Sequence, residues 1–517
     1  MNTLHDQHVL ILGLGASGLA MARWCARCGA QVTVADTRSA PPQLAALQVA
    51  LPAVRFVSGA FDAGLIEGSA IRAVFKSPGL TPLEVAVVAD AARALGIPVA
   101  GELTLFAQAL VDLRATRDYA PKVLAVTGTN GKTTVTALTG QLVARAGKRV
   151  LVAGNIGPTL LDTLSAALDA DALPQVWVLE LSSFQLDGES SFEPTAAAVL
   201  NITQDHLDWH GSMAAYAQAK ARIFGQHGLL LLNRDDAAVM ALRSPALPEA
   251  ALPTARSARA KVQRPVIRAY ATFGADLPVR PGDFGLEDVN GMVWLVRALE
   301  ADETIKKRNN TQEPEVFIQR LMPADALRIR GRHNALNALA ALALACAADC
   351  ALGPMLYGLR EYRGEPHRVE SVGSINGVEY FDDSKGTNVG ATVAAVNGLG
   401  SERKLIVILG GEGKGQDFSP LAQPLARHAR AAVLIGRDAA LIRAALQATD
   451  VALVDAASME LAVNAASELA QPGDAVLMSP ACASFDMFDN YEHRSRVFVQ
   501  ALGKLADAAG VALEASL

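Results

Sequence analysis

The sequence predicts an α/β protein built from three domains. Apolar runs of four to seven residues, such as "QVTVAD" and "KLIVILGG", alternate with longer helical patterns and end at Gly or Asp, which is typical of buried parallel strands. Two separate glycine-rich loops each lie between such a run and a helical pattern. A chain of 517 residues has room for about three domains at roughly 150 residues each.

Composition limits the function. The net charge of −6 gives no reason to expect nucleic acid or an anionic membrane as a partner. The N-terminus lacks a basic segment before its apolar run, which argues against a secretory signal. The longest uncharged apolar run, Ala338–Ala348, is too short to span a bilayer and predicts a buried helix. Five cysteines without a repeated pattern fit a reducing cytoplasm; Cys25 and Cys28 are expected to be small buried hydrophobes rather than a zinc or redox pair.

Two polar stretches suggest domain boundaries. "DLRATRDYAPK" (112–122) precedes the second glycine loop, and "REYRGEPHR" (360–368) follows an Ala-rich helix. We expect domains at 1–118, 119–363 and 364–517. The charged stretch Glu300–Glu315 predicts an exposed loop inside the middle domain.

The first glycine loop indicates a Rossmann-like N-terminal domain. Strand, Gly13-x-Gly15-x-x-Gly18, helix and second strand are followed by Asp36, eighteen residues after Gly18. The glycines let a nucleotide diphosphate approach the backbone, and the helix N-terminus adds partial positive charge. NAD, and with it an oxidoreductase or a regulatory nucleotide-binding protein, is one reading of this pattern.

The second loop, "TGTNGKTT" (127–134), indicates a central ATPase domain of the P-loop type. Backbone N–H groups from Gly128 to Thr133 can surround phosphate oxygens. Lys132 can reach the β and γ phosphates, and the Thr133 hydroxyl can bind Mg²⁺. The usual pattern has a glycine five residues before Gly131, where this sequence has Val126.

The shortened loop resembles that of the Mur ligase family, and the resemblance extends over nearly the whole chain. The stretches that carry it are "GNIG" (154–157), "ELSSFQL" (180–186), "NITQDHLDWH" (201–210), "GRHNALNALAA" (331–341), "PHR" (366–368), "DDSKGTN" (382–388), "GGEGKGQDF" (410–418) and "SPACASFDMF" (479–488). The N-terminal glycine loop and "SPACASFD" narrow the match to the D-glutamate-adding branch.

The resemblance implies an ATP-dependent amide ligase. Its expected reaction adds D-glutamate to UDP-N-acetylmuramoyl-L-alanine through an acyl phosphate, in cytoplasmic peptidoglycan precursor synthesis for cell-wall growth and division. It also implies a Rossmann-like C-terminal domain. Alternatives are another Mur-type amino-acid ligase or a folylpolyglutamate synthase, although the latter has no need of the N-terminal loop. We expect a monomer that binds small molecules only.

The resemblance also implies residue roles. Lys132, Glu180, His206 and Lys220 are the expected catalytic residues. Two Mg²⁺ ions are expected, and their expected ligands are Thr133, Glu180, His206 and Lys220. The family lysine that matches Lys220 is carbamylated by CO₂, which converts a cation into an anionic ligand and requires a neutral amine, hence a lowered pKa.

The remaining expected contacts fall into three sets, one for each substrate. The ATP set is Gly128, Thr129, Asn130, Gly131, Lys132, Thr133, Thr134, Asn334, Asn337, Arg368 and Asp383. The UDP-substrate set is Gly15, Ala16, Ser17, Asp36, Thr37, Arg38, Ser77, Gly79, Asn155 and Gln185. The D-glutamate set is Lys385, Thr387, Lys414, Ser484, Phe485 and Tyr491, where Phe485 and Tyr491 depart from the family's more usual Leu and Phe.

Overall fold

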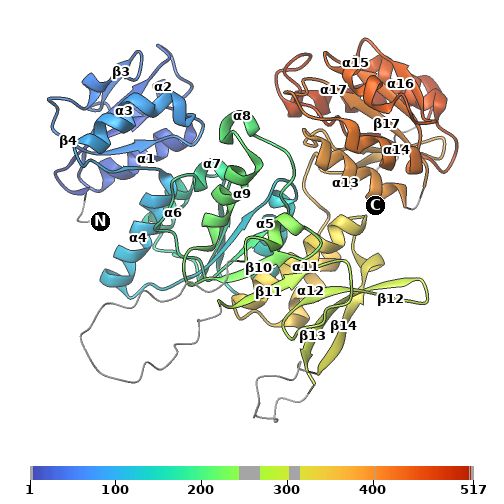
Figure 1. Cartoon of the computed structure of the whole chain (residues 1–517), viewed down its shortest axis with the longest axis horizontal. Coiled ribbons are helices and arrows are strands. Elements are labelled where there is room, and N and C mark those ends of the chain that lie inside the picture. The colour runs from blue at the N-terminus through green and yellow to red at the C-terminus, as the bar shows by residue number, and fades with distance from the viewer. Residues whose placement is uncertain (1–3, 244–267, 302–314, 402, 512, 514–517) are drawn as a thin grey trace, which may run out of the picture.

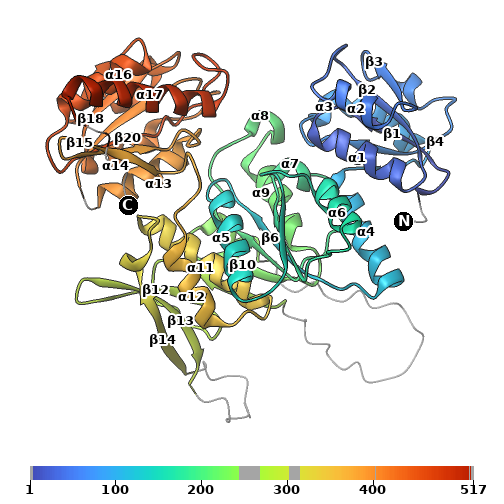
Figure 2. The ribbon, with the colours of Figure 1, turned by 180° about the vertical axis from the view of Figure 1, so that it is seen from behind.

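The computed structural model describes residues 4–243, 268–301, 315–401, 403–511 and 513. Three β-sheets follow one another along the chain, each flanked by helices, so the expected three-part α/β organisation is confirmed. Figures 1 and 2 show the N-terminal and C-terminal parts on opposite sides of the central part. Among the described helices, none combines the length and apolar character needed to cross a membrane.

The N-terminal sheet has five parallel strands in the order β3-β2-β1-β4-β5, which is the Rossmann-like arrangement. Its strands are β1 (His8–Leu12), β2 (Gln31–Asp36), β3 (Arg55–Ser58), β4 (Ile71–Lys76) and β5 (Val99–Ala100). The helices are α1 (Ala16–Arg27), α2 (Leu44–Ala50), α3 (Pro82–Ala94) and α4 (Glu102–Arg117). The strand sequences are apolar on both faces because helices cover both sides of the sheet.

The first and second parts share one apolar core. Helix α4 follows the first sheet and packs against both α1 and α6 (Leu160–Asp169) of the central part. Phe106 of α4 meets the fully buried Trp177 edge-to-face, with ring centroids 5.2 Å apart. Buried side chains from both sheets therefore form a continuous cluster rather than two separate cores.

The central sheet has nine strands in the order β14-β13-β12-β11-β10-β9-β6-β8-β7. Its parallel strands are β6 (Lys122–Thr127), β7 (Val150–Gly154), β8 (Val176–Glu180), β9 (Ala196–Val199), β10 (Leu229–Asn233), β11 (Tyr270–Phe273) and β12 (Phe284–Val289). The helices are α5 (Lys132–Arg145), α6, α7 (Ser183–Leu186), α8 (Leu207–His210), α9 (Met213–Ala221), α10 (Ala237–Met240), α11 (Arg332–Ala347) and α12 (Leu352–Glu361). The expected buried Ala-rich helix is confirmed as α11.

An antiparallel extension completes this sheet. Strand β12 also pairs antiparallel with β13 (Met292–Glu300), and β13 pairs antiparallel with β14 (Val316–Pro323). Glu300 stands opposite Val316, so the charged stretch expected to be a loop joins the ends of two paired strands. Of that stretch, residues 302–314 lie outside the described part of the chain.

The C-terminal sheet has six strands in the order β15-β16-β20-β17-β18-β19, and only β15 is antiparallel to its neighbour. The strands are β15 (Glu370–Ile375), β16 (Val378–Asp382), β17 (Leu405–Gly410), β18 (Ala429–Ile435), β19 (Ala452–Asp455) and β20 (Ala475–Met478). The helices are α13 (Val389–Gly400), α14 (Ala422–His428), α15 (Ala439–Leu446), α16 (Met459–Leu469) and α17 (Tyr491–Ala509). This part has its own two apolar clusters.

The proposed domain boundaries lie between elements. Residue 118 follows the end of α4, and residue 363 lies between α12 and β15. Cys25 of α1 and Cys28 at its C-cap are buried free thiols, and burial raises the pKa of both. Their surroundings fit the expectation of small buried hydrophobes.

Candidate active site

The second glycine loop connects β6 to α5. Gly131 has a φ of +83°, in the left-handed region, and a Cβ there would come within 2.8 Å of Asn337 Oδ1, so the position favours glycine. Lys132 begins α5, and its Nζ donates to the carbonyl oxygens of Gly128 and Thr129, both at 2.9 Å. Burial lowers the pKa of Lys132. The loop thus holds a cation against its own backbone where phosphates are expected.

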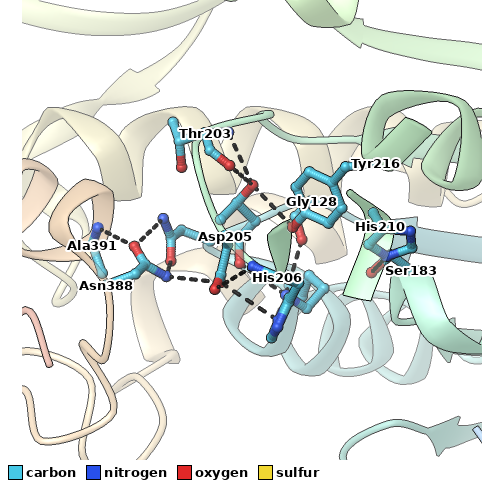
Figure 3. A network of polar contacts seen from close by, with 12 residues as sticks. Gly128, Ser183, Thr203, Asp205, His206, His210, Tyr216, Asn388 and Ala391 are labelled. Carbon is cyan, nitrogen blue, oxygen red and sulfur yellow. Dashed lines mark hydrogen bonds and ion pairs between the residues drawn. The ribbon is translucent and has the colours of Figure 1, made fainter. Parts of the chain in front are cut away.

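A second layer of hydrogen bonds fixes this loop to the segment after β9. The Thr129 hydroxyl donates to the Thr203 carbonyl at 3.2 Å and accepts from the Thr203 N–H at 3.0 Å. Asn130 N–H donates to Asn201 Oδ1 at 2.8 Å. Figure 3 shows Thr203, Asp205 and His206 arranged along this segment beside the loop. The phosphate loop is therefore preorganised by the segment that carries His206.

Lys220 of α9 lies directly behind the loop. Its side chain is buried, with 1% exposed, and its Nζ donates to the same Gly128 carbonyl as Lys132, again at 2.9 Å. Burial, with the nearby charge of Lys132, holds the pKa of Lys220 well below its ordinary value. Two ammonium groups on one carbonyl repel each other, so this position favours a neutral amine.

Glu180, at the end of β8, is the buried carboxylate of the site. Only 1% of the residue is exposed, and its Oε1 accepts a hydrogen bond from Asn155 Nδ2 at 2.8 Å. Its Oε2 is buried and has no hydrogen-bond partner among the described residues. An unpaired carboxylate oxygen in the cleft that Thr133 also lines fits the hard oxygen ligands that Mg²⁺ prefers.

His206 is the N-cap of α8 and has a φ of +54°. Its Nε2 lies 3.5 Å from Asp205 Oδ2, and the Phe184 ring packs against it with centroids 4.7 Å apart. Burial lowers the pKa of His206, which favours the neutral imidazole that binds metals. His206 lines the same cleft as Glu180 and Thr133, whereas Lys220 lies behind the loop.

A different trio brings metal-binding atom types closest together among the described residues. Ligand atoms of His367, Glu370 and Asp382 lie within 4.8 Å of one another. His367 Nδ1 lies 2.9 Å from Asp382 Oδ2, which also accepts from Ser495 Oγ at 2.6 Å, while Oδ1 accepts from Ser384 N–H. Both oxygens of Asp382 are already engaged, so these bonds anchor the start of the C-terminal domain.

A cleft of about 520 Å³ joins the central and C-terminal domains at this loop. Its walls carry Lys132, Thr133, Asn155, Glu180 and His206 from one side and Arg368, Lys385, Thr387, Lys414 and Tyr491 from the other. Arg368 Nη2 donates to Thr133 Oγ1 at 2.7 Å across the boundary. The arrangement places cations of the C-terminal domain opposite the phosphate loop.

A second pocket beside Gly131 carries the expected nucleoside contacts. Asn334, Asn337, Arg368 and Asp383 line it together. Asn337 Nδ2 donates to Asn334 Oδ1 at 3.0 Å, as their i, i+3 spacing on α11 predicts. Asp383 is buried and accepts from Ser479 Oγ at 2.6 Å, and burial raises the pKa of Asp383 to about 7.

The six expected D-glutamate residues do not all reach the cleft. Lys385, Thr387, Lys414 and Tyr491 line it, with Lys385 Nζ 5.4 Å from the Tyr491 ring centroid. Ser484 is buried outside the lining, and Phe485 is 65% exposed with Lys414 Nζ 5.9 Å from its ring centroid. All six assignments stay predictions.

The N-terminal glycine loop sits at the carboxyl end of β1. A Cβ on Gly18 would lie 2.0 Å from the Gly13 carbonyl oxygen, so glycine is required for this close approach. Gly15 and Ala16 form the start of α1, followed by Ser17. Asp36 is buried, accepts from Leu14 N–H at 2.7 Å, and forms two hydrogen bonds of 2.8 Å with Arg38.

The Arg38 guanidinium holds the pKa of Asp36 down at about 2. Thr37, between them, is exposed. The Ser77 hydroxyl donates to the Gly13 carbonyl at 2.8 Å, so it supports the loop, and Gly79 lies in the turn that follows. Gln185 caps α7 by accepting from Ser182 N–H at 3.0 Å and lines a pocket between the first two domains.

Several residues of the site escaped the sequence analysis. Asn388 exchanges hydrogen bonds with Asn130 and also donates to Asp205 Oδ2 at 3.3 Å. The fully buried Arg494 donates to the carbonyls of Cys482 and Ser384, which ties together two loops of the C-terminal domain. Asn388 stands within the quoted "DDSKGTN" motif, but nothing local marks Arg494, because its partners are backbone atoms distant in sequence.

Comparison with known proteins accounts for this architecture. The Mur ligase MurD-like N-terminal domain family matches residues 7–101, the Mur ligase middle domain matches 126–271, and the Mur ligase glutamate ligase domain matches 367–482. The chain therefore belongs to the Mur ligase family. Within that family it belongs to the MurD group, as its N-terminal domain and its curated relatives agree.

The curated relatives cover nearly the whole chain. UDP-N-acetylmuramoylalanine–D-glutamate ligase of Albidiferax ferrireducens is 73% identical and covers 99% of each chain. The enzymes of the same name from Polaromonas sp. and Burkholderia mallei are 59% and 56% identical. Among solved structures, MurF of Thermotoga maritima superposes with a TM-score of 0.54 at 14% identity, over 97% of this chain and 96% of that one. MurC of Thermotoga maritima superposes with a TM-score of 0.52 at 19% identity, over 97% and 100%. These two show a shared fold.

Proposed function

We propose that this protein is an ATP-dependent ligase that joins D-glutamate to UDP-N-acetylmuramoylalanine in peptidoglycan precursor synthesis. The observation that carries the proposal is the cleft between the central and C-terminal domains, where Lys132 of the phosphate loop faces Arg368 and Lys385. The curated relatives of that activity, up to 73% identical, support the choice of substrates.

The reaction brings anions together, and the site is built to offset their repulsion. A carboxylate of the UDP-linked acceptor attacks the γ-phosphorus of ATP, the bond to the β-phosphate oxygen breaks with release of ADP, and an acyl phosphate forms. The D-glutamate amine then attacks the acyl carbon, and phosphate leaves. Lys132 holds the β and γ phosphates, and Arg368 brings a second cation to the same oxygens from the other domain.

Mg²⁺ supplies further positive charge to the transferring phosphoryl group when it is bound. We propose Thr133, Glu180 and His206 as its ligands, because Glu180 Oε2 is buried without a hydrogen-bond partner among the described residues and His206 favours its neutral form. Asn155 fixes the other Glu180 oxygen, which orients the free one.

Lys220 is proposed to act as a carbamate. Carbamylation by CO₂ consumes a neutral amine, releases a proton and yields an anion, and burial beside Lys132 lowers the pKa of the Lys220 amine, which favours that neutral form. An anion there neutralises Lys132 across the Gly128 carbonyl and offers oxygen atoms to a second Mg²⁺.

The other substrates are assigned by domain. Gly15, Ala16 and Ser17 are proposed to bind the diphosphate, and Asp36, Thr37 and Arg38 the uridine. Ser77, Gly79, Asn155 and Gln185 complete the acceptor site. Asn334, Asn337 and Asp383 are proposed to bind adenosine. Lys385, Thr387 and Lys414 offer cations and a donor to the two carboxylates of D-glutamate, beside Ser484, Phe485 and Tyr491.

The decisive experiment is phosphate release from Mg-ATP with UDP-N-acetylmuramoylalanine and one amino acid at a time. D-Glutamate is expected to support release, whereas L-glutamate, L-lysine and meso-diaminopimelate are not. Release with a different amino acid would replace the proposed substrate, and no release with any would remove the proposal. We also propose that the protein is a monomer and acts in the cytoplasm. Gel filtration with light scattering tests whether it is a monomer.

A further inference from the structure

Lys76 is a cation fixed beside the N-terminal glycine loop. It ends β4 and pairs in register with Leu12, the last residue of β1 before the loop. The next residue, Ser77, donates its N–H to the Leu12 carbonyl at 2.8 Å and its hydroxyl to the Gly13 carbonyl at 2.8 Å. Adjacent strands lie about 4.8 Å apart, so the backbone of Lys76 lies beside Leu12, one residue before the first glycine of the loop.

The charge of Lys76 is unmatched in the described part of the chain. The side chain is half-buried, yet it makes no hydrogen bond or ion pair with a described residue. Burial lowers the pKa of Lys76, with Asp187 acting weakly in the opposite direction. Arg38, which also lies near the loop, already donates two hydrogen bonds to Asp36.

A second unpaired donor lies next to Lys76. The Nζ atom of Lys76 lies 5.9 Å from the ring centroid of Trp209, which belongs to helix α8 of the central domain. Trp209 Nε1 is buried and has no hydrogen-bond partner among the described residues. An ammonium and an indole N–H without acceptors, from two domains and in one place, indicate that an acceptor group binds there.

The acidic residues of the surrounding pocket do not pair with Lys76. Lys76 lines a pocket between the first two domains together with Gln185, Asp187 and Glu189. Asp187 pairs with Arg222 at 3.0 Å. Glu189 accepts from Thr104 Oγ1 at 2.6 Å and from the N–H groups of residues 190–192. A third carboxylate of the same lining, Glu102, accepts from Leu161 N–H at 3.0 Å, and its buried Oε2 has no hydrogen-bond partner among the described residues. Burial raises the pKa of Glu102, which favours its neutral form, so none of the three carboxylates forms an ion pair with Lys76.

We propose that Lys76 binds the diphosphate of the UDP-linked substrate beside the N-terminal glycine loop. This inference rests on the proposed function. A diphosphate carries at least two negative charges, and Gly15, Ala16 and Ser17 offer backbone N–H groups and a hydroxyl but no cation. Lys76 supplies that charge, and Trp209 holds the ammonium in place from the central domain.

The test compares two ligands that differ in the diphosphate. Calorimetry with UDP and with uridine is run on the full-length protein, on Lys76→Met and on Lys76→Arg. Lys76→Met is expected to weaken UDP roughly ten- to hundredfold, the range for losing a charged hydrogen bond, and to leave uridine unchanged. Lys76→Arg is expected to keep UDP affinity within about threefold, because the cation remains. Arg72→Met, at the other end of β4, is the matched control and is expected to change neither affinity.

Three results would overturn the assignment. Equal loss of UDP and uridine affinity in Lys76→Met indicates a structural role. Unchanged UDP affinity with a raised KM for UDP-N-acetylmuramoylalanine places Lys76 at the acceptor carboxylate instead. Loss of UDP affinity in Lys76→Arg, with an unchanged unfolding midpoint, excludes charge as the reason. Because UDP binding needs no turnover, failure of the ligase assay leaves this comparison interpretable.

Discussion

Asn130 of the phosphate loop and Asn388 at the N-terminus of α13 exchange side-chain hydrogen bonds, each amide nitrogen donating to the other's oxygen at 3.1 Å. Asn388 also accepts from Ala391 N–H at 2.9 Å, which caps α13, and Figure 3 shows it between Ala391 and Asp205. One side chain therefore begins a helix of the C-terminal domain and docks that helix on the ATP loop.

Replacing Asn388 separates these two tasks. Asn388→Ser keeps a helix cap but loses the amide exchange, so kcat/KM for D-glutamate is expected to fall about tenfold while stability changes by less than ~1 kcal/mol. Asn388→Ala is expected to lose about 1 kcal/mol of stability as well. Steady-state kinetics and urea unfolding measure the two effects. Equal kinetics for wild type and Asn388→Ser would show that docking does not need this pair.

Glu180→Gln is expected to abolish Mg²⁺-dependent turnover while stabilising the metal-free protein. The buried, unpaired Oε2 of Glu180 costs about 1–3 kcal/mol in the folded state, and a neutral amide reduces that cost. Thermal unfolding in EDTA checks the stability, and Mg²⁺ titration of phosphate release checks the activity. A less stable variant would show that another cation compensates this carboxylate.

Activity is expected to depend on dissolved CO₂ through Lys220. Protein kept in degassed, bicarbonate-free buffer should lose turnover and regain it when bicarbonate is added, and a ¹³C carbamate signal should appear with the activity. Lys220→Ala should be inactive and show no signal. A full signal in Lys220→Ala would place the carbamate on another amine.

Asp383 is expected to make stability fall as pH rises towards neutrality. The pKa of this carboxyl is about 7 in the folded protein and 3.8 ordinarily, so the folded state keeps a proton that the unfolded state has released. Its contribution is complete below about pH 3.8 and is lost as pH rises through about 7, at up to ~1.4 kcal/mol per pH unit. Denaturant unfolding between pH 5 and 8 should give this slope in the difference between wild type and Asp383→Asn. A flat difference would mean that Asp383 is ionised throughout.

Arg494→Met is expected to raise the KM for D-glutamate and to destabilise the C-terminal domain by roughly 2–4 kcal/mol, because it leaves the buried carbonyls of Ser384 and Cys482 unpaired. Ser384 precedes Lys385 in the cleft wall. The exposed neighbour Arg496→Met serves as the control and should change neither quantity. A variant in which only the KM for ATP changes would show that Arg494 does not support D-glutamate binding.

Local signals in the sequence were sufficient for the parallel sheets and for both glycine loops. The run before Gly13 and the run before Gly128 each gave a strand followed by a helix, and Glu180 lies at the end of its strand as expected. The antiparallel extension from β12 to β14 was missed because its strands lie at the sheet edge and are less uniformly apolar.

Contacts between domains could not be predicted in the same way. Asn388 and Lys76 contact partners more than a hundred residues away, in another domain, so no periodicity or spacing marks them. The hydroxyl of Ser77 supports the glycine loop, a role that the sequence did not indicate, and its expected contact with the substrate stays a prediction. Sequence patterns thus identified the residues at strand ends and left the cross-domain partners to the structure.

The apolar core that joins the N-terminal and central domains through Phe106 and Trp177 has a consequence for how the chain can be divided. Cutting after α4 removes one wall of that core, so neither fragment should refold alone. The C-terminal domain keeps two cores of its own and should survive as a separate fragment. A calorimetric scan of the intact chain should therefore resolve two melting transitions, with the first two domains melting as a single unit.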